Sequence, residues 1–423
     1  MPQKPSKPLI SLGSPTGRSY LNFRISRRFA VRSALFLSAL AVLVGGSSML
    51  VPKVLGTADG AIGSVYDLPP GPWGQLSAQP ILLEAPQSRL SPAFRLGDGR
   101  WYFAARDKAE VKRIVLEAGL TAEQSAALLQ TLQSVPDRPE LMAVVPSTQL
   151  IRELSPGIRS SLYEILARLP ENLAQSEPFR TTDLYLDDWL DAKELPAGLI
   201  AQVRSLLWRR GNSVLFSDYN TVADSIPSPS EKLKLLGQLT RKSSLMIKLR
   251  VPSQGDVEPL VEYWGTQGRR DRVRPILAAI ARSGGGDLDI SNLLPLFARM
   301  RLYRFPDPLP GSDLGPACHW TTFNFFNLGT PDDAFHNVEG IEKALRENYV
   351  VATGEPRFGD IVLLTLPDGS SIHSAVHIAD GIVFTKNGPS LATPFVFSTV
   401  QEMLAFYPNS QSIRLTFYRR AGN

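Results

Sequence analysis

The sequence predicts an α+β protein with an N-terminal membrane helix, a mostly helical middle domain and a C-terminal domain built on an antiparallel sheet. Three observations lead to this prediction. Residues 34–51 carry no charge, residues 108–300 repeat apolar side chains at helical spacing, and residues 360–387 alternate strand-like runs with turn residues. At 423 residues the chain is long enough to build two or three separate cores.

Residues 1–33 form a basic tail with seven Lys or Arg residues and no acidic residue. Outside this tail, 38 basic residues face 40 acidic ones, so the rest of the chain is close to neutral. A protein that binds nucleic acid concentrates positive charge on a folded face, and the sequence indicates no such face. We therefore expect no nucleic-acid partner.

The stretch "ALFLSALAVLVGGSSMLV", residues 34–51, is long enough to cross the hydrocarbon core of a bilayer as a helix. Because the positive flank precedes it, the tail is expected in the cytoplasm and the rest of the chain outside. We expect a retained signal-anchor that spans the inner membrane once, with the bulk of the chain in the periplasm. The alternative is a cleaved signal peptide, which the absence of a clear A-x-A site after residue 51 disfavours.

Residues 52–100 are rich in Pro and Gly and predict a tether that leads into one or two strands. Residues 101–302 predict a mostly helical accessory domain with two short strand-like runs, at 212–217 and 244–251. In this domain Thr121 is the N-cap of one helix and Ser155 that of another, followed by Pro156. This region contains no His or Cys, and its charged runs are typical of solvated helix faces. The Pro-rich segment "YRFPDPLPGSDLGPA" then marks the start of a C-terminal domain, residues 303–423.

The C-terminal domain holds the single cysteine, Cys318, and all four histidines of the chain. A single Cys is most often a small core residue, and in an exported protein it cannot pair within its own chain. Cys318 directly follows Gly315-Pro316-Ala317 at the start of a predicted helix, and a helix N-terminus lowers a thiol pKa. This placement favours a nucleophile. His319 cannot be its base, because adjacent helical side chains diverge by about 100°.

A base is available in a predicted β-hairpin about fifty residues later. "DIVLLTL" predicts one strand, and "IHSAVHIA" followed by "GIVFTKN" predicts two strands joined at Asp380-Gly381. His373 and His377 are four residues apart on one strand and are expected on the same face. Either can reach the thiolate.

The motifs "RFGDIVLL" and "HSAVHIADG" resemble those of the NlpC-type cell-wall peptidases, which belong to the papain-like superfamily, and the resemblance covers about residues 312–410. It implies a papain-like α+β domain with Cys318 as nucleophile, Gly359-Asp360 at the family's "GD" position and His373 as base. The family usually has Asp before its cysteine and Ser-Gly after it, whereas this chain has Ala317 before and His319-Trp320 after.

The third catalytic residue has several candidates. The family position, twelve residues after the base, is Thr385. A two-residue turn would place Lys386 on the face of His373, and a three-residue turn would place Thr385 and Asn387 there, with Asn387 nearer. An amide oxygen can accept the imidazole N–H and fix its tautomer, so we choose Asn387, with Thr385 as the alternative. The side chains expected to bind substrate are those of His319, Trp320, His377, Thr385 and Lys386.

The resemblance implies hydrolysis of an amide bond in a peptidoglycan stem peptide, through a thioester on Cys318 and without a cofactor. No metal site is expected, because His373 and His377 have no convincing third ligand nearby. Three alternatives remain open. The domain is a lipid acyltransferase or thioesterase of the same superfamily, or a catalytically inactive envelope-binding module, or part of a structural envelope protein whose helical domain does the work.

Overall fold

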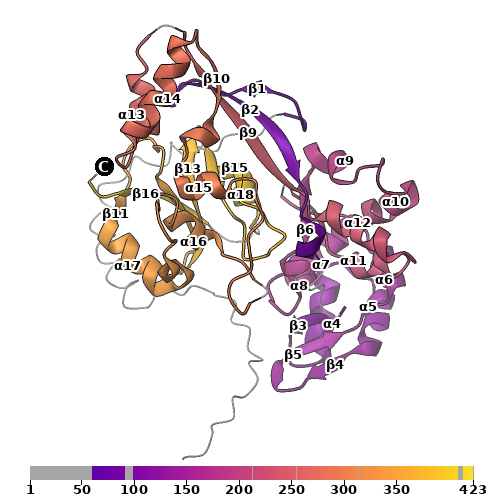
Figure 1. Ribbon diagram of the computed structural model, residues 1–423. Coiled ribbons are helices and arrows are strands. Elements are labelled where there is room, and N and C mark those ends of the chain that lie inside the picture. Colours follow the sequence, from indigo (N-terminus) through magenta and orange to yellow (C-terminus); the bar gives the residue numbers. More distant parts are fainter. Residues whose placement is uncertain are drawn as a thin grey trace, which may run out of the picture.

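A computed structural model describes residues 60–90, 99–211, 213–253, 255–312, 314–407 and 413–422 (Figure 1). Within these residues the chain is a mixed α and β structure with four sheets, and all the strand pairs in these sheets are antiparallel. This agrees with the predicted α+β class. The predicted basic tail and the predicted membrane helix at 34–51 lie outside the described residues. Among the residues that are described, none of the helices has the length and apolar character needed to span a membrane.

Residues 99–240 form a lobe that we call the mixed lobe. It was expected to be mostly helical, but it contains two three-stranded sheets, ordered β3-β5-β4 and β6-β8-β7. Their strands are short, and a run of four apolar residues does not distinguish strand from helix. The strands are β3 (Trp101–Ala104), β4 (Gln133–Val135), β5 (Arg138–Val144), β6 (Phe179–Thr182), β7 (Trp208–Arg210) and β8 (Ser213–Phe216).

Five of the nine helices described in the mixed lobe begin at a residue whose side chain caps the helix. Thr121 forms a capping box with Gln124, and the Ser155 side chain accepts from the Ile158 N–H with Pro156 in the first turn, as predicted. The helices are α4 (Lys108–Glu117), α5 (Ala122–Leu128), α6 (Thr148–Glu153), α7 (Pro156–Leu166), α8 (Leu173–Ser176), α9 (Leu186–Trp189), α10 (Ala197–Ser205), α11 (Tyr219–Ala223) and α12 (Pro229–Leu239).

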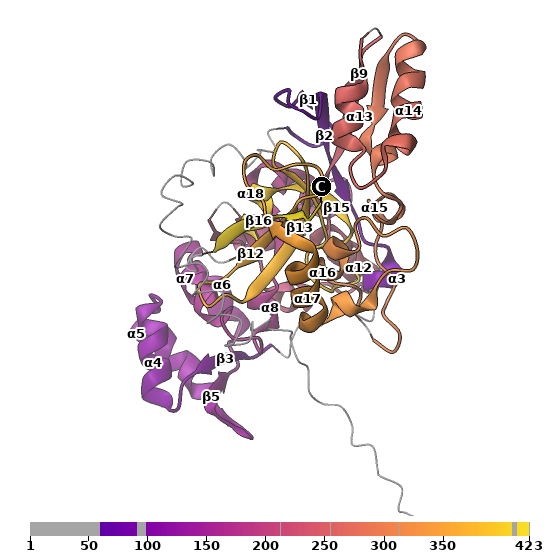
Figure 2. The same ribbon diagram turned by 90° about the vertical axis from the view of Figure 1, so that its left-hand side faces the viewer.

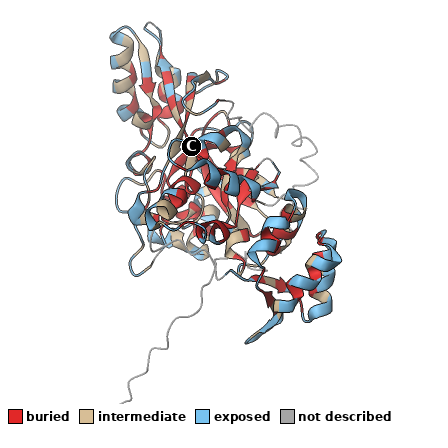
Figure 3. Ribbon diagram, turned by 90° about the vertical axis from the view of Figure 1, so that its right-hand side faces the viewer, coloured by how far each residue is buried: buried red, intermediate tan, exposed pale blue. Residues whose placement is uncertain are grey.

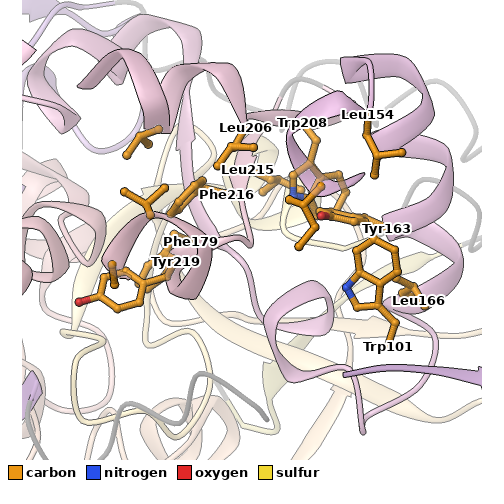
Figure 4. Packing of buried hydrophobic residues seen from close by; sticks show 14 of the residues in the cluster. Trp101, Leu154, Tyr163, Leu166, Phe179, Leu206, Trp208, Leu215, Phe216 and Tyr219 are labelled. Carbon is orange, nitrogen blue, oxygen red and sulfur yellow. The ribbon is translucent and has the colours of Figure 1, made fainter. Parts of the chain in front are cut away.

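Aromatic side chains hold the core of the mixed lobe together (Figure 4). The ring of Tyr163 on α7 lies edge-on between Trp101 and Trp208, with ring centroids 5.7 and 5.6 Å away. The buried Tyr163 hydroxyl donates to Asp218 at 2.7 Å. These contacts join α7 to one strand of each small sheet, so the two sheets share one core.

A four-stranded sheet, ordered β1-β2-β9-β10, runs beside the C-terminal domain. It contains β1 (Tyr66–Asp67), β2 (Gln75–Leu83), β9 (Lys242–Val251) and β10 (Gly286–Asp289), and the nearby helices are α3 (Gln87–Leu90), α13 (Glu258–Trp264) and α14 (Arg270–Arg282). β2 pairs with β9 over its whole length, from Gln75 opposite Arg250 to Leu83 opposite Lys242. Residues 52–100 were expected to lead from a tether into one or two strands, and β1 and β2 are two strands within this range. The partner of β2, β9, lies far along the chain, and local composition gives no sign of this pairing.

The C-terminal domain contains a six-stranded sheet, ordered β11-β16-β12-β13-β14-β15. Its strands are β11 (Tyr349–Val351), β12 (Ile361–Thr365), β13 (Ser371–Ala379), β14 (Ile382–Thr385), β15 (Val396–Thr399) and β16 (Arg414–Arg420). Its helices are α16 (Cys318–Phe323), α17 (Val338–Asn348) and α18 (Val400–Ala405), and α15 (Leu296–Arg301) precedes the domain. The predicted strand, turn and hairpin between residues 360 and 387 are present as β12, β13 and β14.

The C-terminal sheet and the four-stranded sheet meet at β15 and β9. The Ser244 hydroxyl on β9 donates to the Phe397 carbonyl at 3.2 Å and accepts from the Phe397 N–H at 3.1 Å. Figures 1 and 2 show α13 and α14 at one end of the molecule and α4 and α5 at the other, with the C-terminal sheet between them. Figure 3 shows that buried residues are concentrated in the strands of this sheet.

Candidate functional site

Cys318 is the first residue of α16 and packs against β13. Its side chain is buried, and the backbone N–H groups of Ser374 and His319 donate toward its sulfur. Burial nevertheless raises the pKa of the Cys318 thiol, although these N–H groups and the charge of Lys386 act in the opposite direction. The expected depression of the thiol pKa at the helix N-terminus is therefore wrong for this structure. The helix is only six residues long and its N-terminus is covered, so loss of hydration outweighs the effect of the helix.

His373 lies on β13, and Thr385 on β14 holds its ring. The imidazole Nε2 and the Thr385 hydroxyl oxygen are 3.0 Å apart, and both side chains are buried. Burial, with a smaller contribution from nearby His319, lowers the pKa of His373 to about 3. His373 is therefore a neutral imidazole at physiological pH, the form that can accept a proton. The contact with Thr385 occupies Nε2 and leaves Nδ1 as the second ring nitrogen, which can exchange a proton.

The register of the hairpin explains why Thr385, and not Lys386, shares the face of His373. The turn consists of two residues, Asp380 and Gly381, and both have positive φ, at 42° and 71°. A two-residue turn alone would place Lys386 on the face of His373, but β13 carries one extra residue at Ile378, between the His377 and Ala379 pairs, and this bulge shifts the register by one residue. Strand β14 ends at Thr385, which contacts the imidazole, whereas Asn387 lies beyond the end of the strand. Asn387 lines a cavity between the mixed lobe and the C-terminal domain.

Cys318 and His373 both lie at Ser374 of β13, Cys318 through its sulfur and His373 as the preceding residue. Val376 belongs to the buried cluster of Trp320 on α16, whereas Ala375 belongs to the buried cluster beneath α18. Because side chains alternate along a strand, Ser374 points toward α16 and His373 toward α18. Along the edge that faces β14, the pairing of β13 stops at Val376, and the N–H of Ser374 beyond it donates toward the Cys318 sulfur. Cys318 is therefore close to the backbone next to His373, but in the described part of the chain no hydrogen bond joins Cys318 to His373.

Tyr407, at the end of α18, covers this region. Its ring centroid is 6.0 Å from that of His373, and its hydroxyl donates to the Ile372 carbonyl at 3.2 Å. Burial raises the pKa of Tyr407 well above its usual value, and the nearby thiolate form of Cys318 adds to this effect. Tyr407 was not predicted as a site residue. It comes from a segment whose place over the sheet depends on the fold.

Lys386 is fully buried on the α16 side, which is unusual for a lysine. Its ammonium donates to the carbonyls of Gly388 at 2.6 Å and Ser390 at 3.0 Å, and among the described residues no carboxylate forms an ion pair with it. Burial lowers the pKa of Lys386 to about 7, and the thiolate of Cys318 opposes this change. Lys386 is therefore a second titratable group beside the sulfur. It was predicted to bind substrate, but in this structure it holds the 388–390 loop.

The remaining predicted binding residues lie in the core. His319 contacts the Ser374 hydroxyl through Nδ1 at 2.9 Å, and His377 donates from Nδ1 to the Arg357 carbonyl at 3.1 Å. Burial is the largest factor that lowers the pKa of each histidine to about 4. Trp320 packs on Phe297 with ring centroids 5.2 Å apart. All three side chains support the fold around the site, and none of them faces the inter-lobe cavity.

The "GD" pair has a structural role. Gly359 has φ 93°, and a Cβ there would lie 2.5 Å from the ring of Phe326. Asp360 accepts from the Arg357 N–H at 2.9 Å and forms a bidentate ion pair with Arg419, at 3.0 and 2.6 Å. This pair ties the start of β12 to the last strand of the sheet. Arg419 was not predicted, because nothing in the local sequence relates it to residue 360.

A cavity of about 240 Å³ lies between the mixed lobe and the C-terminal domain. It is lined by residues of β6, the start of β9 and the segment after β14, among them Asn387. Cys318 and His373 are not part of its lining. Among the described residues, no group of three or more His, Cys, Asp or Glu side chains could hold a metal ion.

Comparison of the chain with protein-family models, with curated proteins and with solved structures finds no match.

Proposed function

We propose that the C-terminal domain is an exported cysteine hydrolase of papain-like architecture that cleaves an amide bond, with a peptidoglycan stem peptide as substrate. The observation that supports this most is the contact between His373 Nε2 and Thr385, twelve residues later. This contact occupies one ring nitrogen and leaves Nδ1 as the nitrogen that would act as the base, on the residue next to Ser374, whose N–H donates toward the Cys318 sulfur. The N-terminal helix would hold the enzyme at the membrane.

The proposed reaction begins from a neutral pair, because burial raises the pKa of the Cys318 thiol and lowers that of His373. His373 takes the thiol proton as the sulfur attacks the amide carbonyl, in the manner of a general base. The Cys318 backbone N–H stabilises the oxyanion, and His373 then gives the proton to the leaving amine. Water hydrolyses the thioester in a second cycle of the same groups.

Digestion of purified peptidoglycan by the full chain tests this proposal. We expect soluble peptide fragments from the wild-type protein, identified by mass, and none from Cys318→Ser or His373→Gln. Ser205→Ala, an exposed change in the mixed lobe, is the matched control and should leave the products unchanged. Equal product from wild type and Cys318→Ser would refute the hydrolase proposal.

A second candidate, a catalytically inactive envelope-binding module, is favoured by the burial of Cys318 and by the position of the cavity away from it. In that case the Cys318→Ser protein would bind peptidoglycan as well as the wild type, and neither would digest it. The third candidate, a lipid acyltransferase, gains no support from the cavity, because Cys318 and His373 do not line it and an acyl group would have to reach the sulfur.

A further inference from the structure

The cavity between the mixed lobe and the C-terminal domain contains two half-buried cations, one from the mixed lobe and one from the four-stranded sheet. Arg180 is on β6 of the mixed lobe, and Lys242 is the first residue of β9, next to the C-terminal domain. Arg180 donates to the Glu402 carbonyl at 3.2 Å and lies over the ring of Phe406, with its guanidinium carbon 5.1 Å from the ring centroid. Among the described residues, no carboxylate forms an ion pair with either cation.

The third cation of the lining, Arg241, differs from the other two because carboxylates neutralise its charge. Arg241 forms ion pairs with Glu84 at 2.8 Å and Glu194 at 2.9 Å. Its neighbour Lys242 has no such partner, although it also lines the cavity. Burial lowers the pKa of Lys242 to about 8, with a further contribution from Arg180, and burial lowers that of Arg180 to about 10. The two positive charges are therefore close to each other, and bound negative charge would stabilise both.

The rest of the lining limits how much negative charge a ligand can bring. Glu177 and Glu402 also belong to the lining. Glu402 is partly used by its own helix, since its carboxylate accepts from the Ser398 hydroxyl at 2.8 Å. The charge of Glu402 acts on Arg180, so these carboxylates offset part of the positive charge and reduce the attraction for any anion. Because the cost of removing water from a ligand rises steeply with its charge, a single carboxylate enters more readily than doubly charged phosphate. Asn387 and Ser243 supply polar groups for amides.

We infer that this cavity binds a small ligand with one carboxylate and neighbouring amide groups, such as the free C-terminal end of a peptide, and that Arg180 and Lys242 hold the carboxylate. The planar guanidinium of Arg180 suits a carboxylate, and the ammonium of Lys242 adds a point charge. The site needs both the mixed lobe, which supplies Arg180, and the four-stranded sheet, which supplies Lys242. The inference does not depend on hydrolysis, since the cavity is separate from Cys318.

Isothermal titration of the full chain carrying Cys318→Ser tests binding without turnover. The probes are N-acetyl-dialanine with a free C-terminal carboxylate, the same dipeptide with a C-terminal amide, and inorganic phosphate. We expect the carboxylate form to bind at least about tenfold more tightly than the amide, because a charge-assisted hydrogen bond is lost. Phosphate at the same concentration should not displace it. Equal binding of acid and amide, no binding of either, or displacement by phosphate would each overturn the assignment.

Variants at two positions, Lys242 and Arg180, locate the bound carboxylate. Lys242→Met should weaken binding of the dipeptide acid by about tenfold, and Arg180→Lys should weaken it less than Arg180→Gln, because the charge is retained. Lys248→Met, six residues further along β9 at an exposed position, is the matched control and should bind as the parent does. Thermal unfolding of each variant confirms that it is folded. If Lys242→Met and Lys248→Met bind equally well, the carboxylate is not held in this cavity.

Discussion

Thr385 is the residue on which the orientation of His373 depends. The hydroxyl is 3.0 Å from Nε2, and replacing it with a methyl group removes a buried hydrogen bond without changing the volume much. We expect Thr385→Val to lower kcat/KM on peptidoglycan peptides by about tenfold, the effect of losing a hydrogen bond worth about 1–2 kcal/mol. Thr385→Ser should retain most of the activity. Thr416→Val on β16 is the control, and an equal loss there would assign the effect to general destabilisation.

The reactivity of Cys318 follows from its burial. Because burial raises the thiol pKa, less of the group is thiolate at pH 7 than in a free thiol. We expect iodoacetamide to alkylate the native protein more than about tenfold more slowly than glutathione at pH 7, with a rate that still rises above pH 9. Unfolding in urea should remove the difference. A rate that levels off near neutral pH would show a stabilised thiolate and contradict this expectation.

At the scale of single elements, the hairpin of β13 and β14 determines the site. Its turn requires Gly381 at φ 71°, where a side chain is strained. We expect Gly381→Ala to lower the free energy of unfolding by about 1 kcal/mol, as measured by urea denaturation. Gly329→Ala is the control, since its φ is not positive and its nearest contact is 3.9 Å away. Equal stability of the two variants would show that the turn tolerates a side chain.

The elements also show which features the sequence could predict. The strands and the turn of residues 360–387 follow from their alternation and from Asp380-Gly381, and the helix caps at Thr121 and Ser155 follow from their residue types. The bulge at Ile378 has no such signal, because Ile suits a regular strand as well as a bulge. That one residue moves Lys386 off the face of His373 and brings Thr385 onto it. The contact of His373 with Thr385, and not with Asn387, goes with the end of β14 at Thr385, which strand composition does not determine.

Similar limits apply to the longer-range parts of the fold. The sequence predicts one or two strands within residues 52–100 but not the partner of β2, because pairing with β9 is not a local property. The position of Tyr407 over His373 and the ion pair of Asp360 with Arg419 also join distant segments. The thiol pKa was predicted to fall because the helix start was visible in the sequence, whereas the burial that raises it was not. The residue type and its place at a helix start suggested a reactive thiol, but burial determines that the thiol pKa rises.

At the scale of the whole molecule, the buried histidines make stability dependent on pH. Burial lowers the pKa of His373 to about 3 and those of His319 and His377 to about 4, below the ordinary value of about 6.5. The unfolded chain therefore binds more protons below pH 6.5, and stability falls as pH decreases from about 6.5 toward 4. Each histidine contributes about 1.4 kcal/mol per pH unit in this window. Asp218, whose pKa burial raises to about 6, partly opposes the trend.

This prediction is checked by urea unfolding at several pH values between 7 and 5. The free energy of unfolding should fall steadily in the wild type, and His377→Gln should reduce the slope by about one proton. A slope that the variant does not change would mean that His377 is protonated in the folded protein. The comparison uses slopes, so a uniform loss of stability in the variant does not affect it.

The contact between β15 and β9 has a consequence for how this protein can diversify. Ser244 joins the edge of the C-terminal sheet to β9, the strand that pairs with β2. Recombination therefore cannot transfer the C-terminal domain alone without loss, because a cut near residue 303 would remove the β9 contact from β15. Chains that share this domain should have acquired it together with its preceding 240 residues, or should carry a polar replacement on that edge.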